Sequence, residues 1–461
     1  MVNRVIPNLL AVRARQLDLA VAGTFESALA VLDGVGRMIG RPFDPPIPLW
    51  LWLSDQPRGE TGDAQLQPFK RLFRICDRPA LGRRWLLLVA LAPEALNESR
   101  LEALLAQFTG AGARAGSDAD AGGLAVVPAP ADGAQRRWMT QRLLQANWLP
   151  IFVDAPAQRR APEVALGALD SDHLGRIIHE LFLENAWTRG ERLGSTPALH
   201  PWRRLDETYR QANRSQAAHI ACKLACGGLI AIPEPVMADG QQAPLWSRPE
   251  FIEPLSRMEH DRWASDRLLD GWVYGARRDN AARHHPDLIP YDDLSEAIRE
   301  KDRVAVATIP FILQLGACGW RPLATVQLAG RWPDPNTQAR WRRRWRADLR
   351  RVVEERAPAV LEFQLNPAVW EECQLGLLLA ECGFPLALRL SAPASVSALA
   401  TDAAHREALL GCLTRCRRVL WADDAPHLAT SPLPALSPQP LEVMLAEGGG
   451  LRVERHGMVE V

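Results

Sequence analysis

The chain has 461 residues, with 54 basic and 54 acidic side chains and 8 cysteines. This length is enough for about three domains with buried cores. The balanced charge provides no overall field that would favour nucleic acid or an anionic membrane, and the longest apolar runs are too short to span a bilayer. Cysteines without a signal peptide predict reduced thiols. We therefore expect a cytoplasmic protein that binds neither nucleic acid nor a membrane.

The first third alternates between apolar runs and helix-like stretches. Near-continuous apolar runs, typical of strands buried on both faces, occupy residues 46–53, 84–91, 123–129 and 149–154. Helix-like stretches lie around residues 27–39, 65–75, 96–108 and 134–147. This alternation predicts a mostly parallel, doubly wound sheet, that is, a Rossmann-like α/β domain over residues 1–170.

The predicted N-terminal domain lacks a recognisable dinucleotide fingerprint. Such a site needs glycines in the turn between the first strand and the first helix, so that backbone amides can approach a pyrophosphate. The nearest match, GAGARAG at residues 110–116, follows a predicted helix and runs into a Gly/Asp/Ala-rich loop. We therefore expect a degenerate domain without NAD. It is either an inert Rossmann-like relic or a different sensor domain.

The central third contains a predicted amphipathic helix at residues 254–270, ended by Gly271. His260, Trp263 and Arg267 fall at i, i+3 and i+7, so they share one face. That face would combine a titratable imidazole, an aromatic ring and a permanent positive charge. A purine could stack on the ring, and a phosphate could bind to the guanidinium. The alternative is that Trp263 is core and Arg267 a solvated flank.

The segment DGWVYG follows this helix. Trp272 and Tyr274 alternate about Val273 between two glycines, which predicts a short extended segment with both aromatic rings on the same side. We expect this segment to close a pocket over the helix, with Arg278 or Lys301 reaching the same pocket.

Lysine is rare in this chain, since only Lys70, Lys223 and Lys301 occur among the 54 basic residues. A compact ammonium can be needed where a planar guanidinium does not fit. Sampling noise is the alternative explanation. The adjacent His284 and His285 have no cysteine or carboxylate at zinc-ligand spacing beside them, so we expect no metal there.

Residues 258–316 carry five short motifs in order: E-H-x-x-W, x-G-W-x-Y-G, R-x-D, H-P-x-L-x-P-Y-x-x-L and E-K-D-R. This order closely resembles the RyR domain, a small module repeated in the cytoplasmic part of ryanodine-receptor calcium channels and present as single copies in many bacterial proteins. Residues 174–187 and 200–228 resemble bacterial proteins in which a TrkA-type nucleotide-binding domain precedes an RyR domain. The resemblance implies a mainly α region over residues 171–320, with the RyR core at residues 246–316.

The last part, residues 321–461, again alternates strand-like and helix-like segments and predicts a C-terminal α/β domain ending in a hairpin. Its most basic stretch, RWRRRWRADLRR at residues 340–351, places Trp341, Trp345 and Leu349 every four residues. A solvated helix with one packed stripe is the default interpretation. An RNA- or phosphate-binding surface is the alternative.

No catalytic motif is present, so we expect a protein that is not an enzyme and holds no resident cofactor. The leading hypothesis is a ligand-sensing regulatory protein that binds an adenine nucleotide or nucleotide-derived signal and couples it to an unknown protein partner or homo-oligomer. Its predicted ligand-binding residues are His260, Trp263, Arg267, Trp272, Tyr274, Arg278 and Lys301. The bacterial relatives suggest a defence or stress-signalling context. Alternatives are a protein-interaction scaffold without a small ligand and, disfavoured by the missing fingerprint, an NAD-linked enzyme or redox sensor.

Overall fold

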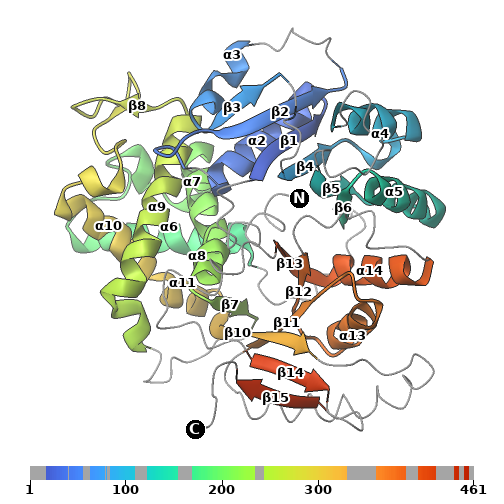
Figure 1. The fold of residues 1–461 in the computed structure, drawn as a ribbon. Helices are drawn as coiled ribbons and strands as arrows, with labels where there is room; N and C mark the ends of the chain where they lie inside the picture. The colour runs from blue at the N-terminus through green and yellow to red at the C-terminus, as the bar shows by residue number, and fades with distance from the viewer. Residues whose placement is uncertain are drawn as a thin grey trace.

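The structure is a computed structural model, and it describes residues 17–39, 41–55, 63–77, 79, 84–108, 122–153, 169–233, 243–329, 360–390, 403–421, 441–445 and 451–455. It is mixed α/β, as the sequence predicts. A helical region lies beside an N-terminal sheet and a C-terminal sheet (Figure 1). None of the helices in the described ranges has both the length and the apolar character needed to cross a bilayer.

The N-terminal part is a parallel sheet of six strands in the order β3-β2-β1-β4-β5-β6, which is the strand order of the Rossmann fold. Its elements are β1 (Leu17–Gly23), α2 (Phe25–Ile39), β2 (Ile47–Leu53), α3 (Asp63–Leu66), β3 (Phe73–Cys76), β4 (Arg84–Ala90), α4 (Glu98–Leu105), β5 (Gly122–Pro128), α5 (Gly133–Gln145) and β6 (Trp148–Val153).

One predicted element of this sheet is wrong. The sequence predicts a single helix over residues 65–75. The structure instead has the end of α3, a 3-10 turn at Gln67–Arg71 and strand β3. Pro68 stands near the start of the 3-10 turn and cannot donate the backbone bond that a continuing helix would need. Phe73 is 1 % exposed, so packing favours the strand at this point.

Helices cover both faces of the N-terminal sheet, as a doubly wound fold requires. On β1, Leu19 and Val21 pack in a cluster with Leu32 of α2. The alternate residues of β1 pack in a second cluster with residues of α4 and α5, which include Leu101 and Leu143. Because successive side chains of a strand point to opposite faces, α2 lies on one face and α4 and α5 on the other.

The helical region has its own apolar core, which joins residues of α6, α8, α9 and α11. Its elements are α6 (Ser171–Thr188), α7 (Glu207–Ala218), α8 (Ile220–Cys226), β7 (Leu229–Ile232), α9 (Pro249–Leu269), β8 (Val273–Tyr274), β9 (His284–His285), α10 (Glu296–Ala307) and α11 (Ile309–Leu315). Helix α9 begins five residues before the predicted start and has Pro254 inside it. Gly271 follows its end with φ +80°, a conformation that glycine adopts without strain.

The C-terminal part is a sheet in the order β13-β12-β11-β10-β14-β15. Its elements are β10 (Gly319–Ala329), β11 (Val360–Leu365), α13 (Trp370–Glu381), β12 (Leu386–Leu390), α14 (Ala403–Arg415), β13 (Cys416–Trp421), β14 (Leu441–Leu445) and β15 (Leu451–Arg455). The final hairpin is formed by β14 and β15, as predicted. The basic stretch at residues 340–351 lies outside the described residues.

Strand β7 links the helical region to the C-terminal sheet. It pairs antiparallel with the first half of β10, with Leu229 opposite Pro322 and Ile232 opposite Gly319. Strand β10 therefore crosses position 320, where the sequence predicts a domain boundary.

Candidate ligand-binding site

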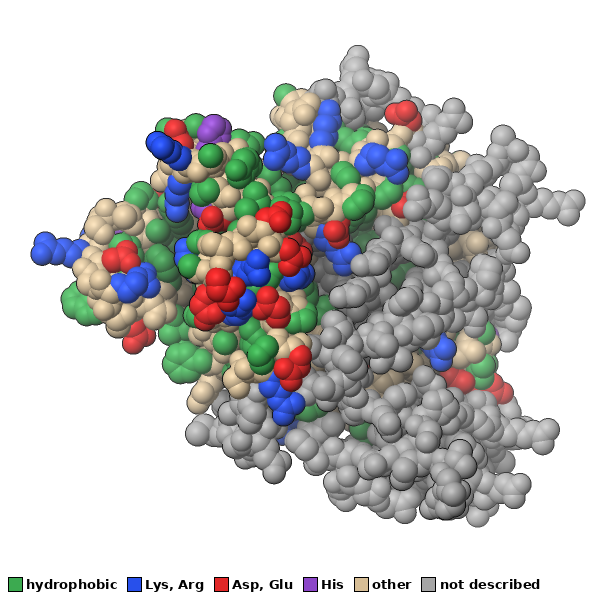
Figure 2. Space-filling view, turned by 60° about the vertical axis from the view of Figure 1, so that its left-hand side comes forward, with side chains coloured by type: hydrophobic (Ala, Val, Ile, Leu, Met, Phe, Trp, Pro, Cys, Tyr) green, Lys and Arg blue, Asp and Glu red, His purple; other side chains and the backbone are tan. Residues whose placement is uncertain are grey.

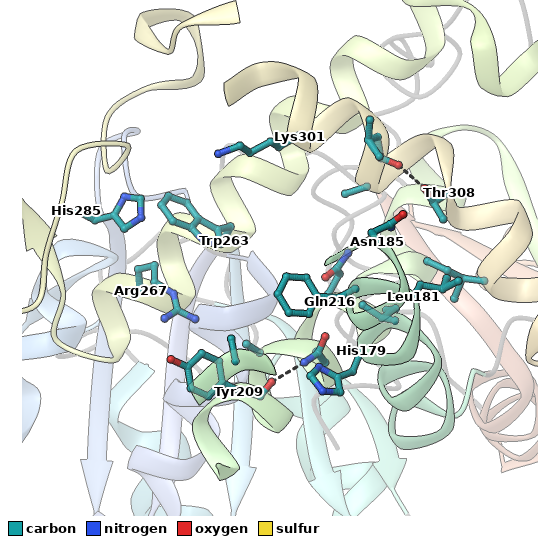
Figure 3. A pocket seen from close by; sticks show the side chains of 18 of the residues that line it. His179, Leu181, Asn185, Tyr209, Gln216, Trp263, Arg267, His285, Lys301 and Thr308 are labelled. Carbon is teal, nitrogen blue, oxygen red and sulfur yellow. Dashed lines mark hydrogen bonds between the residues drawn. The ribbon is translucent and has the colours of Figure 1, made fainter. Parts of the chain in front are cut away.

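A cavity of about 510 Å³ lies within the helical region (Figure 3). One wall comes from α9, α10 and the β8–β9 segment, and the other comes from α6 and α7. In Figure 3, Trp263, Arg267 and His285 lie on one side of the cavity, and Asn185, Gln216 and Leu181 lie on the other. This volume is within the usual range for small-molecule sites.

Five of the seven predicted ligand-binding residues line this cavity: Trp263, Arg267, Trp272, Arg278 and Lys301. They come from α9, α10 and the segment that follows α9. The structure thus brings together residues up to 38 positions apart, since Trp263 and Lys301 share the cavity.

The aromatic side chains of this wall are held in place by their neighbours. The Trp263 ring meets the His285 ring edge-on, with centroids 4.9 Å apart. The backbone N–H of Trp272 donates to the Arg267 carbonyl at 2.8 Å, which fixes Trp272 just after the helix. The Arg267 guanidinium lies over the Trp272 ring at 5.9 Å. The Arg267 guanidinium and the rings of Trp263 and Trp272 are therefore held in position without a ligand.

Arg267 carries a charge that its surroundings do not fully satisfy. Its Nε is buried and has no hydrogen-bond partner among the described residues. Burial lowers the pKa of Arg267, although the charges of Asp270 and Asp266 oppose that effect. Both carboxylates are already bound by Arg37 of α2. An anion in the cavity would supply the acceptor that this buried donor lacks.

Two further cations and an imidazole border the cavity. Lys301 and Arg278 are exposed, and Arg278 Nε donates to the Asn280 side chain at 3.0 Å. Burial lowers the pKa of His285, and its Nδ1 accepts from the Asp287 backbone N–H at 3.1 Å. His285 therefore favours its neutral form, with its apolar ring face available for packing.

The remaining two predicted residues do not line the cavity. His260 is 1 % exposed, and its Nε2 donates to the Ile289 carbonyl at 2.8 Å, while Nδ1 lies 3.4 Å from Asp302. Its ring stacks against the Trp263 ring with centroids 5.5 Å apart, so His260 helps to hold Trp263 in position. Tyr274 is 56 % exposed on β8.

The opposite wall contains residues that the sequence interpretation did not assign to a site. Helix α7 presents Tyr209, Asn213 and Gln216, and α6 presents Phe182 and Asn185. A signal was available, because Tyr209, Asn213 and Gln216 stand at i, i+4 and i+7 and share one helical face. The Asn213 side-chain N–H donates to the Tyr209 carbonyl at 2.8 Å, which leaves its oxygen for another partner.

Beside the cavity residues, α9 also carries part of a buried chain of alternating charges. Lys223 Nζ lies 2.7 Å from Glu259, and Arg262 bridges Glu259 and Asp266. The next link is Arg37 of α2, whose guanidinium lies 3.0 Å from Asp266 and 2.9 Å from Asp270. We call these six side chains the ion chain: Arg37, Lys223, Glu259, Arg262, Asp266 and Asp270. It connects α8, α9 and the N-terminal helix α2.

The first strand-to-helix turn of the N-terminal sheet differs from a dinucleotide site. Because β1 ends at Gly23, the sequence Gly23 to Ala28 occupies the place of the glycine fingerprint, with Phe25 at the second glycine position. The backbone N–H of Phe25 donates to the Asp55 carboxylate at 3.0 Å. A side-chain carboxylate thus takes the helix terminus where a pyrophosphate would bind. The GAGARAG segment at residues 110–116 lies outside the described residues.

Across the described ranges, no group of three or more His, Cys, Asp or Glu side chains is close enough to hold a metal ion. His284 and His285 form the short strand β9, which pairs with β8.

Comparison with known families shows that residues 232–321 match the RyR domain. This segment contains the five motifs at residues 258–316, and it spans about a fifth of the chain. Helices α9, α10 and α11 lie inside the match. Helices α6 and α7, which form the second wall of the cavity, lie outside it.

Proposed function

We propose that this chain is a ligand-sensing regulatory protein that binds a nucleotide or nucleotide-derived signal in the cavity between α6–α7 and α9–α10. The observation that carries this proposal is the chemistry of the lining. Among the described residues, the cavity presents four aromatic side chains and three Lys or Arg side chains, and no carboxylate. In this proposal the protein is a cytoplasmic sensor, not an enzyme.

The lining suits a ligand that is both aromatic and anionic. A base stacked on Trp263 or Trp272 would gain about 1 to 3 kcal/mol, a typical contribution for a base on an aromatic side chain. A phosphate beside Arg267 would accept from the buried Nε and form a charge-assisted hydrogen bond. A cationic ligand would find no carboxylate in the described lining.

The placement of α9 supports a regulatory role. One face of α9 carries Trp263 and Arg267 in the cavity, and the adjacent positions Asp266 and Asp270 bind Arg37 of α2. A ligand that shifts α9 would therefore act on the ion chain and on the N-terminal sheet. The proposal of a nucleotide signal in a bacterial defence or stress system also rests on the resemblance of residues 174–187 and 200–228 to bacterial TrkA-type proteins with RyR domains.

The proposal is tested by calorimetric titration with adenine nucleotides and cyclic nucleotides. We expect Trp263→Leu and Arg267→Gln each to weaken binding roughly ten- to hundredfold, because each removes an interaction of about 1 to 3 kcal/mol. Arg257→Gln is the matched control, since Arg257 is on α9 but pairs with Asp292 at the surface. Native mass spectrometry of protein purified from its own host would show whether a nucleotide is bound.

Thermal unfolding separates ligand contacts from packing. A Trp that serves only as core would cost about 3 to 5 kcal/mol on truncation. Lowered melting temperatures together with no nucleotide bound to the wild type would contradict the sensor proposal.

A second candidate, a protein-interaction role, is favoured by one observation. Phe311 and Leu315 on α11 are 49 % and 48 % exposed and stand at i and i+4, so they form one apolar face. If that face is an interface, Phe311→Glu should dissociate a homo-oligomer in analytical ultracentrifugation. A wild-type protein that sediments as a monomer would count against self-association.

A further inference from the structure

The two ends of the cavity differ in chemistry. The cations Arg267, Arg278 and Lys301 belong to the part of the chain that matches the RyR domain, whereas Asn185, Asn213 and Gln216 belong to α6 and α7. Each carboxamide is neutral and combines an acceptor with a donor. A ligand that spans the cavity would therefore meet positive charge at one end and paired neutral donors and acceptors at the other.

Two of these carboxamides are available to a ligand. In the part of the chain that the structure describes, the side chains of Asn185 and Gln216 make no hydrogen bond with another residue. Both face the cavity across from Trp263 (Figure 3). A group that enters this end without matching hydrogen bonds would leave carboxamide donors and acceptors unsatisfied.

We infer that Asn185 and Gln216 determine which base the cavity accepts, and that they select a purine whose N7 edge has a donor beside the N7 acceptor, as adenine does. This inference rests on the proposed nucleotide site. A carboxamide can pair with adenine through N7 and the N6 amino group. The N7 edges of guanine and hypoxanthine present O6 beside N7, two acceptors that leave the carboxamide oxygen without a donor. With the base bound by Asn185 and Gln216, the phosphates would bind to Arg267 and Lys301.

Three probes separate the two ends of the cavity: ADP, IDP and inorganic pyrophosphate. IDP keeps the diphosphate and ring size of ADP but replaces the N6 amino donor with an acceptor. We expect the wild-type protein to bind ADP about tenfold more tightly than IDP, as the loss of one hydrogen bond predicts. In Asn185→Leu/Gln216→Leu the ratio should fall to within about twofold, while pyrophosphate affinity changes by less than about twofold.

One matched control lies outside the cavity, and the other changes a cation in its lining. Gln211→Leu makes the same substitution on α7 at a residue outside the cavity lining and should keep the ADP preference. Arg267→Gln should weaken the binding of both pyrophosphate and ADP. It should leave the ratio of the ADP and IDP affinities unchanged. Unchanged melting temperatures establish that each variant folds.

The outcomes distinguish this inference from the proposed function. If ADP binding depends on Trp263 but the double leucine variant retains the tenfold preference, the specificity role is wrong and the nucleotide site stands. The same conclusion follows if the wild type binds IDP as tightly as ADP. If the wild type binds no nucleotide, both proposals are wrong.

Discussion

Replacing Lys223 by Met should destabilise the helical region, because it removes one charge of a buried pair and leaves the other. Lys223 is 2 % exposed, and its Nζ lies 2.7 Å from Glu259 Oε2 and 3.0 Å from His219 Nδ1. Removing one partner of a buried ion pair costs about 3 to 5 kcal/mol. Glu259 keeps its contacts with Arg262, so we expect the lower end of this range, about 3 kcal/mol.

Amide hydrogen exchange in α8 and α9 measures this loss as the free energy of local opening, which suits a chain of several domains. The variant Lys223→Met/Glu259→Gln should recover about 1 to 2 kcal/mol, because it neutralises the carboxylate that has lost Lys223 and keeps a hydrogen bond to Arg262. A loss below about 1 kcal/mol for Lys223→Met, or a double variant less stable than the single one, would refute the reasoning.

The loss should also depend on pH. Burial raises the pKa of Glu259, but the charges of Arg262 and Lys223 outweigh this and hold it well below the ordinary value of 4.5. A carboxyl group with a depressed folded pKa contributes stability above its unfolded pKa and loses it as the pH falls through the folded value. The difference between Lys223→Met and the wild type should therefore be constant near neutral pH and shrink below pH 4.5.

Three further substitutions test other parts of the structure. Burial raises the pKa of Glu372 to about 7, so the wild type should lose stability as the pH rises from 4.5 to 7. Glu372→Gln should then raise the free energy of unfolding in urea by about 1 to 3 kcal/mol at pH 8, and an equal gain at pH 5 would contradict this cause. A Cβ on Gly175 would lie 3.1 Å from the Arg214 backbone N, so Gly175→Val should separate α6 from α7, lower the melting temperature and weaken nucleotide binding. Arg257→Gln removes an exposed ion pair and a cation–π contact with Tyr291, and it should change stability by about 1 kcal/mol or less in the same urea assay.

The sequence predicts the buried strands of the N-terminal sheet better than its short elements. Strands such as β4 are apolar along nearly their whole length because helices cover both of their faces, and this pattern can be recognised in the sequence. Strand β3 has four residues and pairs with one neighbour, so its sequence carries little signal. The sequence pattern does not predict strand β1 either. Without this strand, the sequence alone does not place the first strand-to-helix turn at Gly23, where the glycine fingerprint would begin.

One wall of the candidate site follows from helical spacing, and the other does not. Trp263 and Arg267 share the cavity because four positions separate neighbours on a helix. Spacing could not show that His260 turns instead to Asp302 and Ile289, because both partners come from later segments. Gln216 reaches the cavity only through the packing of α7 near α9, a long-range contact that no local pattern encodes.

The pairing of β7 with β10 has a consequence for how such a chain could arise. Residues 232 and 319 are opposite one another, so the segment that matches the RyR domain leaves and re-enters the C-terminal sheet at adjacent points. A segment whose two ends lie close together can be inserted or replaced during evolution without displacing the chain before and after it. Here the cavity lies between the segment that matches the RyR domain and the rest of the chain. Helix α9, which supplies Trp263, is inside the matching segment, and α7, which supplies Gln216, is outside it. The sequence of either part can therefore change while the other stays the same. A segment that still matches the RyR domain can thus take part in a site with a new ligand preference, because helices outside the match line the same cavity.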